Sequence, residues 1–129
     1  MGAKKVLIVE DDLDFLRGLG IRLKASGYDV LSATDGVQAI GATRRDKPDL
    51  ILLDIGLPGG DGYVVMDRLK LIGKMTVPII VLSAKDPSIH RAKALETGAS
   101  VFLHKPVDNC VLLAMMRQLL GEPTVPMHA

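Results

Sequence analysis

The sequence predicts an α/β fold: one doubly wound domain in which a five-stranded parallel sheet lies between two layers of helices. Two observations support this prediction. Short apolar runs alternate with longer segments whose apolar residues recur every three or four positions, as strands alternate with amphipathic helices. The chain also has 129 residues, of which 48% are hydrophobic, which suits a single domain with a substantial core.

The first half of the chain supplies three strands and two helices. The segment 13–25 carries Leu16, Leu19 and Leu23 at helical spacing, and Gly27 follows it as a stop. Asp12 is expected to cap this helix. The run Leu50-Ile51-Leu52-Leu53 is typical of a buried strand, because four bulky aliphatic residues precede a Gly- and Pro-rich segment. The expected strands are 5–10, 29–33 and 49–54, and the expected helices are 13–25 and 36–45.

The second half continues the alternation. Val64, Leu69 and Ile72 lie on one side of an expected helix, and Gly98 stops the next one. The expected strands are 77–82 and 100–104, and the expected helices are 63–72, 88–96 and 108–120. Parallel strands joined by right-handed helical crossovers favour the sheet order 2-1-3-4-5.

Polar side chains stand at the ends of four expected strands. They are Glu10, Asp11 and Asp12 at the first strand, Asp54 at the third, Ser83 at the fourth and Lys105 after the fifth; Ala84 follows Ser83, and Pro106 follows Lys105. The carboxyl ends of parallel strands meet at one edge of the sheet, so these groups should converge. Clustered carboxylates repel one another unless a cation joins them, and their oxygens suit Mg²⁺. Acids, an ammonium group and a hydroxyl together predict a phosphoryl-transfer site.

This combination resembles the receiver domain of two-component response regulators, which has the fold of the chemotaxis response regulator. The resemblance covers residues 4–121 and rests on four motifs in order. These are the acidic pair after the first strand, Asp54 with the Leu-Pro-Gly-Gly-Asp-Gly loop that follows it, Ser-Ala after the fourth strand and Lys-Pro after the fifth. It implies a flavodoxin-like three-layer sandwich, with residues 122–129 as a disordered tail or the start of a linker.

The resemblance also implies a role for each site residue. Asp54 would be the phosphoacceptor, taking a phosphoryl group from the phosphohistidine of a kinase. Asp11, Asp54 and the backbone carbonyl of Gly56 would bind Mg²⁺ directly, and Glu10 would bind it through water. Asp12 would serve as the helix cap.

The remaining family positions would sense the phosphoryl group. Ser83 would donate its hydroxyl to a phosphoryl oxygen, and Ala84 would leave room beside the strand. Lys105 would be the charge partner of the phosphoryl group, before a cis bond to Pro106. Phe102 would be the switch residue, rotating inward when Asp54 is phosphorylated.

The expected output is a change on the surface of the fourth helix, fifth strand and fifth helix, which would control a partner, an output domain or a homodimer. The fifth helix is apolar nearly all round, through Val111, Leu112, Leu113 and Met115 to Met116, so we expect surplus apolar surface there. The other expected partner is a sensor histidine kinase or phosphotransfer protein. The domain would be regulatory, catalysing only its own phosphotransfer and slow self-dephosphorylation.

Three alternatives are less consistent with these residues. A phosphatase of the haloacid dehalogenase type needs a second Asp two positions after the nucleophile, where this chain has Gly56. A flavodoxin needs a first loop that cradles a phosphate, whereas Glu10, Asp11 and Asp12 would repel one. A receiver domain that serves only as an inactive interaction module is disfavoured because all the site residues are present.

Composition narrows the setting. The formal net charge of +1, with acids and bases mixed along the chain, gives no basis for a nucleic-acid or membrane-surface partner. Cys110 is the single cysteine, which excludes an internal disulfide and suits a reducing compartment. With no signal-peptide pattern and no apolar stretch of membrane-spanning length, a cytoplasmic location is expected.

Overall fold

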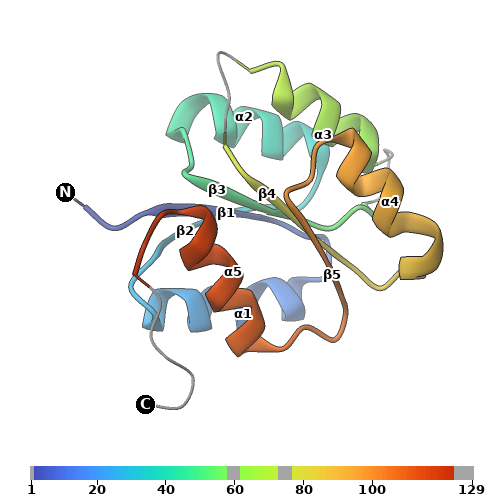
Figure 1. Ribbon diagram of the computed structural model, residues 1–129. Helices are drawn as coiled ribbons and strands as arrows, with labels where there is room; N and C mark the ends of the chain where they lie inside the picture. Colours follow the sequence, from blue (N-terminus) through green and yellow to red (C-terminus); the bar gives the residue numbers. More distant parts are fainter. Residues whose placement is uncertain (1, 58–61, 73–76, 124–129) are drawn as a thin grey trace.

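The computed structural model describes residues 2–57, 62–72 and 77–123, and it confirms the predicted sheet (Figure 1). Five strands pair in parallel in the order β2-β1-β3-β4-β5. They are β1 (Lys5–Val9), β2 (Asp29–Ala33), β3 (Leu50–Leu53), β4 (Ile79–Ser83) and β5 (Val101–His104). The three central strands β1, β3 and β4 therefore have a neighbour on each side.

Helices cover both faces of the sheet, with α1 and α5 on one side and α2, α3 and α4 on the other (Figure 1). Their bounds are α1 (Leu13–Ala25), α2 (Gly36–Asp46), α3 (Gly62–Lys70), α4 (Pro87–Thr97) and α5 (Asn109–Leu119). None of the helices in the described part of the chain has the length and apolar character needed to span a bilayer.

The side chains of each strand alternate between two apolar clusters, as the pleat of a strand requires. In β3, Ile51 and Leu53 join the cluster beneath α2, α3 and α4, whereas Leu50 and Leu52 join the cluster beneath α1 and α5. All four residues are fully buried. A strand covered on both faces reads as a continuous apolar run, which is why β3 was recognisable in the sequence.

An aspartate caps the start of four helices, just after the carboxyl ends of the strands. Asp12 accepts hydrogen bonds from the amides of Asp14 and Phe15, as expected for the cap of α1. Asp35, Asp86 and Asp108 cap α2, α4 and α5 in the same way. These carboxylates satisfy amides that have no partner within their helix, so they are structural groups rather than members of the acidic site.

Several predicted bounds move by one or two residues. Helix α3 covers Gly62–Lys70 rather than 63–72. Position 62 requires glycine, because a side chain there would meet the backbone of Ile55 at 2.3 Å. Strand β4 begins at Ile79 rather than at residue 77, after Pro78, which has no amide hydrogen to donate. At the other end, Glu122 is bound to the folded body by a hydrogen bond from the Tyr28 hydroxyl at 2.7 Å. Residues 124–129 lie outside the described part, so the disordered tail or linker expected over 122–129 stays a prediction.

Candidate functional site

The acidic site lies where β1 and β3 end, side by side in the middle of the sheet. The pattern of strand hydrogen bonds continues one residue beyond each strand. The amide of Glu10 donates to the carbonyl of Ala33 at 2.9 Å, and the amide of Asp54 donates to the carbonyl of Val9 at 3.0 Å. The backbone of both acids is therefore held by the sheet, although both side chains project beyond it.

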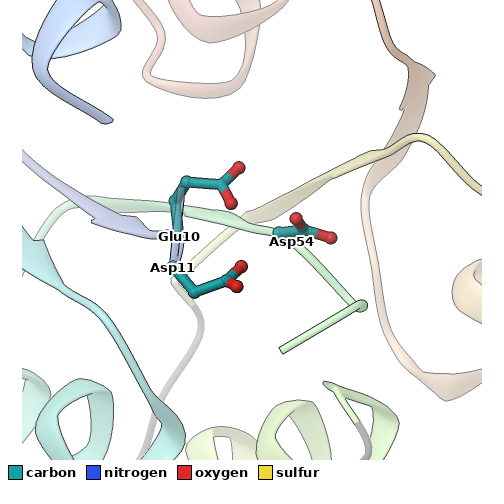
Figure 2. Close-up of side chains that lie close together, drawn as sticks. All are labelled: Glu10, Asp11 and Asp54. Atoms are coloured by element: carbon teal, nitrogen blue, oxygen red, sulfur yellow. The ribbon is translucent and has the colours of Figure 1, made fainter. Parts of the chain in front are cut away.

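Glu10, Asp11 and Asp54 come together as the sequence predicted. Each offers a carboxylate oxygen, and these oxygens lie within 4.8 Å of one another. Figure 2 shows the three carboxylates facing a shared space from two strand ends. Glu10 is only 2% exposed, Asp54 is half-buried and Asp11 is exposed. Oxygen ligands this close, with one open to solvent, fit a small divalent cation such as Mg²⁺.

Lys105 is the cation that the structure places against these acids. Its Nζ donates to Glu10 Oε1 at 2.5 Å and to Asp54 Oδ2 at 3.2 Å. Burial lowers the pKa of Lys105, but the hydrogen bond to Glu10 and the charge of Asp54 outweigh this effect and raise the pKa above its usual value. Lys105 therefore keeps its positive charge at neutral pH, and its ammonium group joins the two strand ends.

Glu10 is held at both carboxylate oxygens. Its Oε1 accepts from Lys105, and its Oε2 accepts from the amide of Asp12 at 3.1 Å. Burial raises the pKa of Glu10, and these two hydrogen bonds act against that rise. A carboxylate held in this way is suited to orienting its neighbours, whereas the exposed Asp11 is better placed to exchange a ligand with solvent.

The ring of Phe15 completes the surroundings of Lys105. Its centroid lies 4.2 Å from the Lys105 Nζ, which is a cation–π contact. Sequence reasoning did not assign this residue to the site. The available signal was its place in the first turn of α1, directly after the Asp12 cap. An aromatic ring there faces the carboxyl edge of the sheet.

Asp54 is also bound by its own loop. Its Oδ1 accepts from the amide of Gly56 at 2.8 Å, and a side chain at position 56 would come within 3.3 Å of the same oxygen. Next to this loop lies a cleft of about 330 Å³, lined by Ile55, Gly56, Leu57, Tyr63, Lys85, His90 and Lys93. Residues 58–61, part of the loop predicted after Asp54, lie outside the described residues.

Ser83, Ala84 and Pro106 stand at the neighbouring strand ends. Ser83 is fully buried, and its Oγ accepts from the amide of Lys85 at 3.0 Å. Ala84 is exposed. The amide of Lys105 donates to the Ser83 carbonyl at 2.8 Å, which ties the end of β5 to the end of β4. The Lys105–Pro106 peptide bond is cis.

Two features of the structure bear on the expected output surface. Phe102 faces inward, with 5% of its surface exposed and the Arg91 guanidinium 5.6 Å from its ring centroid. Its role as the switch residue stays a prediction. Helix α5 uses part of its apolar surface in the core. Leu112 and Met116 are fully buried, Leu113, Met115, Leu119 and Leu120 are partly buried against the core cluster, and Val111 is exposed. The expected contact surface on α5 therefore stays a prediction.

Comparison with known proteins places these features in a family. The family model for the response regulator receiver domain matches residues 6–117. The chain belongs to this family. It is 40% identical to "Response regulator PleD" of Caulobacter vibrioides over 116 residues, which are 89% of this chain and 26% of that protein. It is 38% identical to "Alkaline phosphatase synthesis transcriptional regulatory protein PhoP" of Bacillus subtilis, over 95% of this chain and 50% of that protein.

Solved structures of receiver domains agree closely in fold. The BeF3-activated receiver domain of Klebsiella pneumoniae RstA is 36% identical, with a TM-score of 0.83, covering 91% of this chain and 98% of that one. The receiver domain of Pseudomonas aeruginosa sensor histidine kinase PA1611, solved with a magnesium ion in its active-site cleft, is 30% identical, with a TM-score of 0.83, covering 94% and 100%. The chain is thus a receiver domain of two-component signalling. It spans about a quarter to a half of the curated relatives it matches.

Proposed function

We propose that this receiver domain is a switch activated by transfer of a phosphoryl group to Asp54. One oxygen of the Asp54 carboxylate attacks the phosphorus of a phosphohistidine on a sensor histidine kinase or phosphotransfer protein. The bond from phosphorus to the imidazole nitrogen breaks, and an acyl phosphate forms on Asp54. The observation that supports this proposal best is the placement of Asp54 between two further carboxylates and the ammonium group of Lys105.

Asp54 is suited to be the nucleophile because its position is fixed while one oxygen can be released. The sheet holds its backbone, and the Gly56 amide holds Oδ1. Within the described residues, its Oδ2 accepts one hydrogen bond, the longer of the two from Lys105. A nucleophile that is already oriented loses less entropy on reaching the transition state.

The acidic cluster fits the metal that the family uses. Asp11, Asp54 and the Gly56 carbonyl would hold Mg²⁺, with Glu10 in its outer sphere. When bound, the ion neutralises the charge that develops on the phosphoryl oxygens. The two engaged oxygens of Glu10 support its outer role, because each already has a partner within the protein. The exposure of Asp11 supports its role as a direct ligand.

Lys105 and Ser83 would contact the phosphoryl group once it is attached. Lys105 exchanges its bond to the Asp54 carboxylate for one to a phosphoryl oxygen, because in the acyl phosphate the carboxyl group is uncharged and the negative charge lies on the phosphoryl oxygens. Ser83 donates its hydroxyl hydrogen to another phosphoryl oxygen, and its Oγ already accepts from the Lys85 amide. Ala84 leaves the approach beside β4 open. These exchanges change the contacts at the ends of β4 and β5, next to α4.

The signal would leave through α4, β5 and α5 to a partner protein, an output domain or a second copy of the domain. The domain would act in the cytoplasm, with no nucleic acid or membrane bound by the domain itself. It would catalyse only its own phosphotransfer and slow dephosphorylation. Met116 is not part of the expected contact surface, because it is buried.

Mass spectrometry after incubation with acetyl phosphate and Mg²⁺ tests the proposal. Wild-type protein should gain one phosphoryl group on Asp54, and Asp54→Asn should gain none. Asp12→Asn is the matched control, because Asp12 is the neighbouring acid that caps α1; it should still be labelled. Labelling of Asp54→Asn together with loss of labelling in Asp12→Asn would show that the nucleophile has been misassigned.

Two further variants separate the metal from the switch. Asp11→Asn should lose Mg²⁺ binding and phosphorylation together. Lys105→Ala should still bind Mg²⁺, because it removes no ligand, but the amide resonances of α4 should no longer shift on phosphorylation. Normal phosphorylation of Asp11→Asn contradicts the metal assignment, and a normal shift in Lys105→Ala contradicts the role of the lysine.

A further inference from the structure

Helices α2 and α3 share a groove that the phosphoacceptor site does not use. Its volume is about 280 Å³, and its lining residues are Ile40, Arg44, Arg68, Leu71 and Ile72. We name it the α2–α3 groove. In Figure 1 the two helices run side by side over the sheet, on the face opposite α1 and α5.

Apolar side chains follow the flank of each helix along this groove, and those of Ile40 and Ile72 also pack partly against the core. On α2, Val37, Ile40 and Arg44 stand at i, i+3 and i+7, and Val37 is 82% exposed. Leu71, in the turn after α3, is 81% exposed, and Val64 is exposed too. The core side of these helices is filled by other residues, namely Ala39, Ala42, Thr43, Val65, Met66 and Leu69. An aliphatic stripe that the fold leaves in water marks an interaction surface.

Two unpaired arginines flank the stripe. Arg44 and Arg68 are both exposed, and neither forms an ion pair within residues 2–57, 62–72 and 77–123. The adjacent Arg45 differs, because its guanidinium is bound by Asp46 at 3.0 Å. The groove therefore combines aliphatic side chains with two guanidinium groups that bind no carboxylate among the described residues. Such groups pair well with carboxylates, often through two parallel hydrogen bonds.

We propose that the α2–α3 groove binds an amphipathic helix of a partner protein, with large aliphatic side chains along one face and carboxylates beside them. The aliphatic face would cover Ile40, Leu71 and Ile72, as in other helix-in-groove complexes. The carboxylates would pair with Arg44 and Arg68. Gly41 lies on the same flank of α2, and the space where its side chain would be is open, so a partner backbone can come close.

The positive charge of the groove favours an acidic partner helix over a second copy of the chain. A two-fold contact through the groove would bring Arg44 and Arg68 against the same residues of the copy, and like charges oppose that association. Aliphatic side chains as exposed as Val37 and Leu71 give nothing to a nucleic acid, whose phosphates are bound by cationic and polar groups. A helix with aliphatic and acidic side chains can bind both the aliphatic side chains and the arginines of the groove.

This interaction is separate from phosphorylation. The lining residues begin in the middle of α2, at Ile40, and near the end of α3, at Arg68, whereas the helix N-termini lie at the edge of the sheet that carries Asp54. Occupation of the groove therefore leaves Asp54, Lys105 and the acidic cluster uncovered. Arg44→Glu and Leu71→Asp should still accept a phosphoryl group from acetyl phosphate.

Selection from a phage-displayed library of helical peptides against the whole chain tests the proposal. We expect the selected peptides to combine Leu, Ile or Val at helical spacing with flanking Asp or Glu. On titration into ¹⁵N-labelled protein, they should shift the amides of Ile40, Arg44, Arg68 and Leu71. The double variant Arg44→Glu/Arg68→Glu should bind them about tenfold more weakly, and a peptide with its carboxylates changed to Lys should recover that loss. Arg17→Glu, an exposed arginine of α1, is the matched control and should bind normally.

Several results would overturn the proposal. These are selected peptides that are basic or uncharged, shifts confined to α1 or α4, or equal affinity for wild-type protein and the double variant. Self-association in sedimentation experiments that Leu71→Asp abolishes would assign the groove to a second copy instead. Far-UV circular dichroism and the urea midpoint of each variant establish that the fold is retained, because every changed side chain is exposed.

Discussion

Helix α5 and the α2–α3 pair differ in how they use apolar side chains. The sequence of α5 is apolar nearly all round. Within the described part of the chain, which includes all of α5, Val111 is its one exposed large apolar side chain. The α2–α3 pair has a less apolar sequence, but Val37 and Leu71 are more exposed than Val111. Helix α5 lies on the sheet beside α1 (Figure 1) and packs partly buried side chains on the core, whereas Val37 and Leu71 extend from the α2–α3 pair into solvent. Exposure depends on what covers a helix, more than on how many apolar residues it carries.

The largest expected effect is the difference in the free energy of unfolding between variants of Met116 in α5 and of Leu71 beside α3. Met116→Lys should lower the free energy of unfolding by at least about 4 kcal/mol, because it places an ammonium group in a fully buried site and removes core contacts. Leu71→Lys should change it by less than about 0.5 kcal/mol, because the side chain is already in water. Urea unfolding measures both. Similar changes in the free energy of unfolding for the two variants would contradict the difference in burial between α5 and the α2–α3 pair.

The next effect concerns a residue on the face of the sheet covered by α2, α3 and α4, where the fold also depends on buried side chains. Phe102→Leu should lower the free energy of unfolding by about 1.5 kcal/mol, since it shrinks a buried ring and removes the contact with Arg91. Because the ring already faces inward, its NMR contacts with the core should persist after Asp54 is phosphorylated. A ring that becomes exposed on phosphorylation would contradict this expectation.

A smaller effect is expected at the α1–α5 side, where Tyr28 binds Glu122. Tyr28→Phe should cost about 1 kcal/mol, the typical net contribution of one hydrogen bond. Burial, together with Glu122, raises the pKa of Tyr28 from 10.0 to about 12. The folded protein therefore holds this proton more tightly than the unfolded chain. The resulting stabilisation is complete below pH 10.0 and is lost as the pH rises towards about 12. In denaturation experiments from pH 9 to 12, the free energy of unfolding should decline more steeply for wild-type protein than for Tyr28→Phe.

The smallest expected effect compares one glycine from each side. Gly41 of α2 and Gly18 of α1 both lie within helices, and no atom stands within 4 Å of the place where a side chain would begin. Replacement of either by Ala should raise the free energy of unfolding by up to about 1 kcal/mol, through helix propensity alone. Gly41→Ala should also weaken binding of the selected peptides, whereas Gly18→Ala should not. Equal peptide affinity in the two variants would place the bound helix away from Gly41.

The sequence was sufficient for the sheet order and for the acids at the strand ends. Parallel strands of buried aliphatic residues have a strong pattern, and strand ends place the residues that follow them at one edge. Sequence could not show that Phe102 faces inward or that α5 is covered, because both depend on packing between elements distant in the chain. It also missed Phe15, whose contact with Lys105 joins residues far apart in sequence. The α2–α3 groove was missed for the same reason, since two helices form it jointly.

The burial of β3 has a consequence for how a signal can begin. Asp54 directly follows the strand with β1 and β4 on either side and a full core on both faces. The amides of Leu52, Leu53 and Asp54 should therefore exchange with deuterium only when the whole domain unfolds. We therefore expect the backbone that carries the phosphoacceptor to stay in place on phosphorylation. Phosphorylation should then first change the hydrogen bonds of the side chains around Asp54. Movement should follow in the loops and helices beyond it.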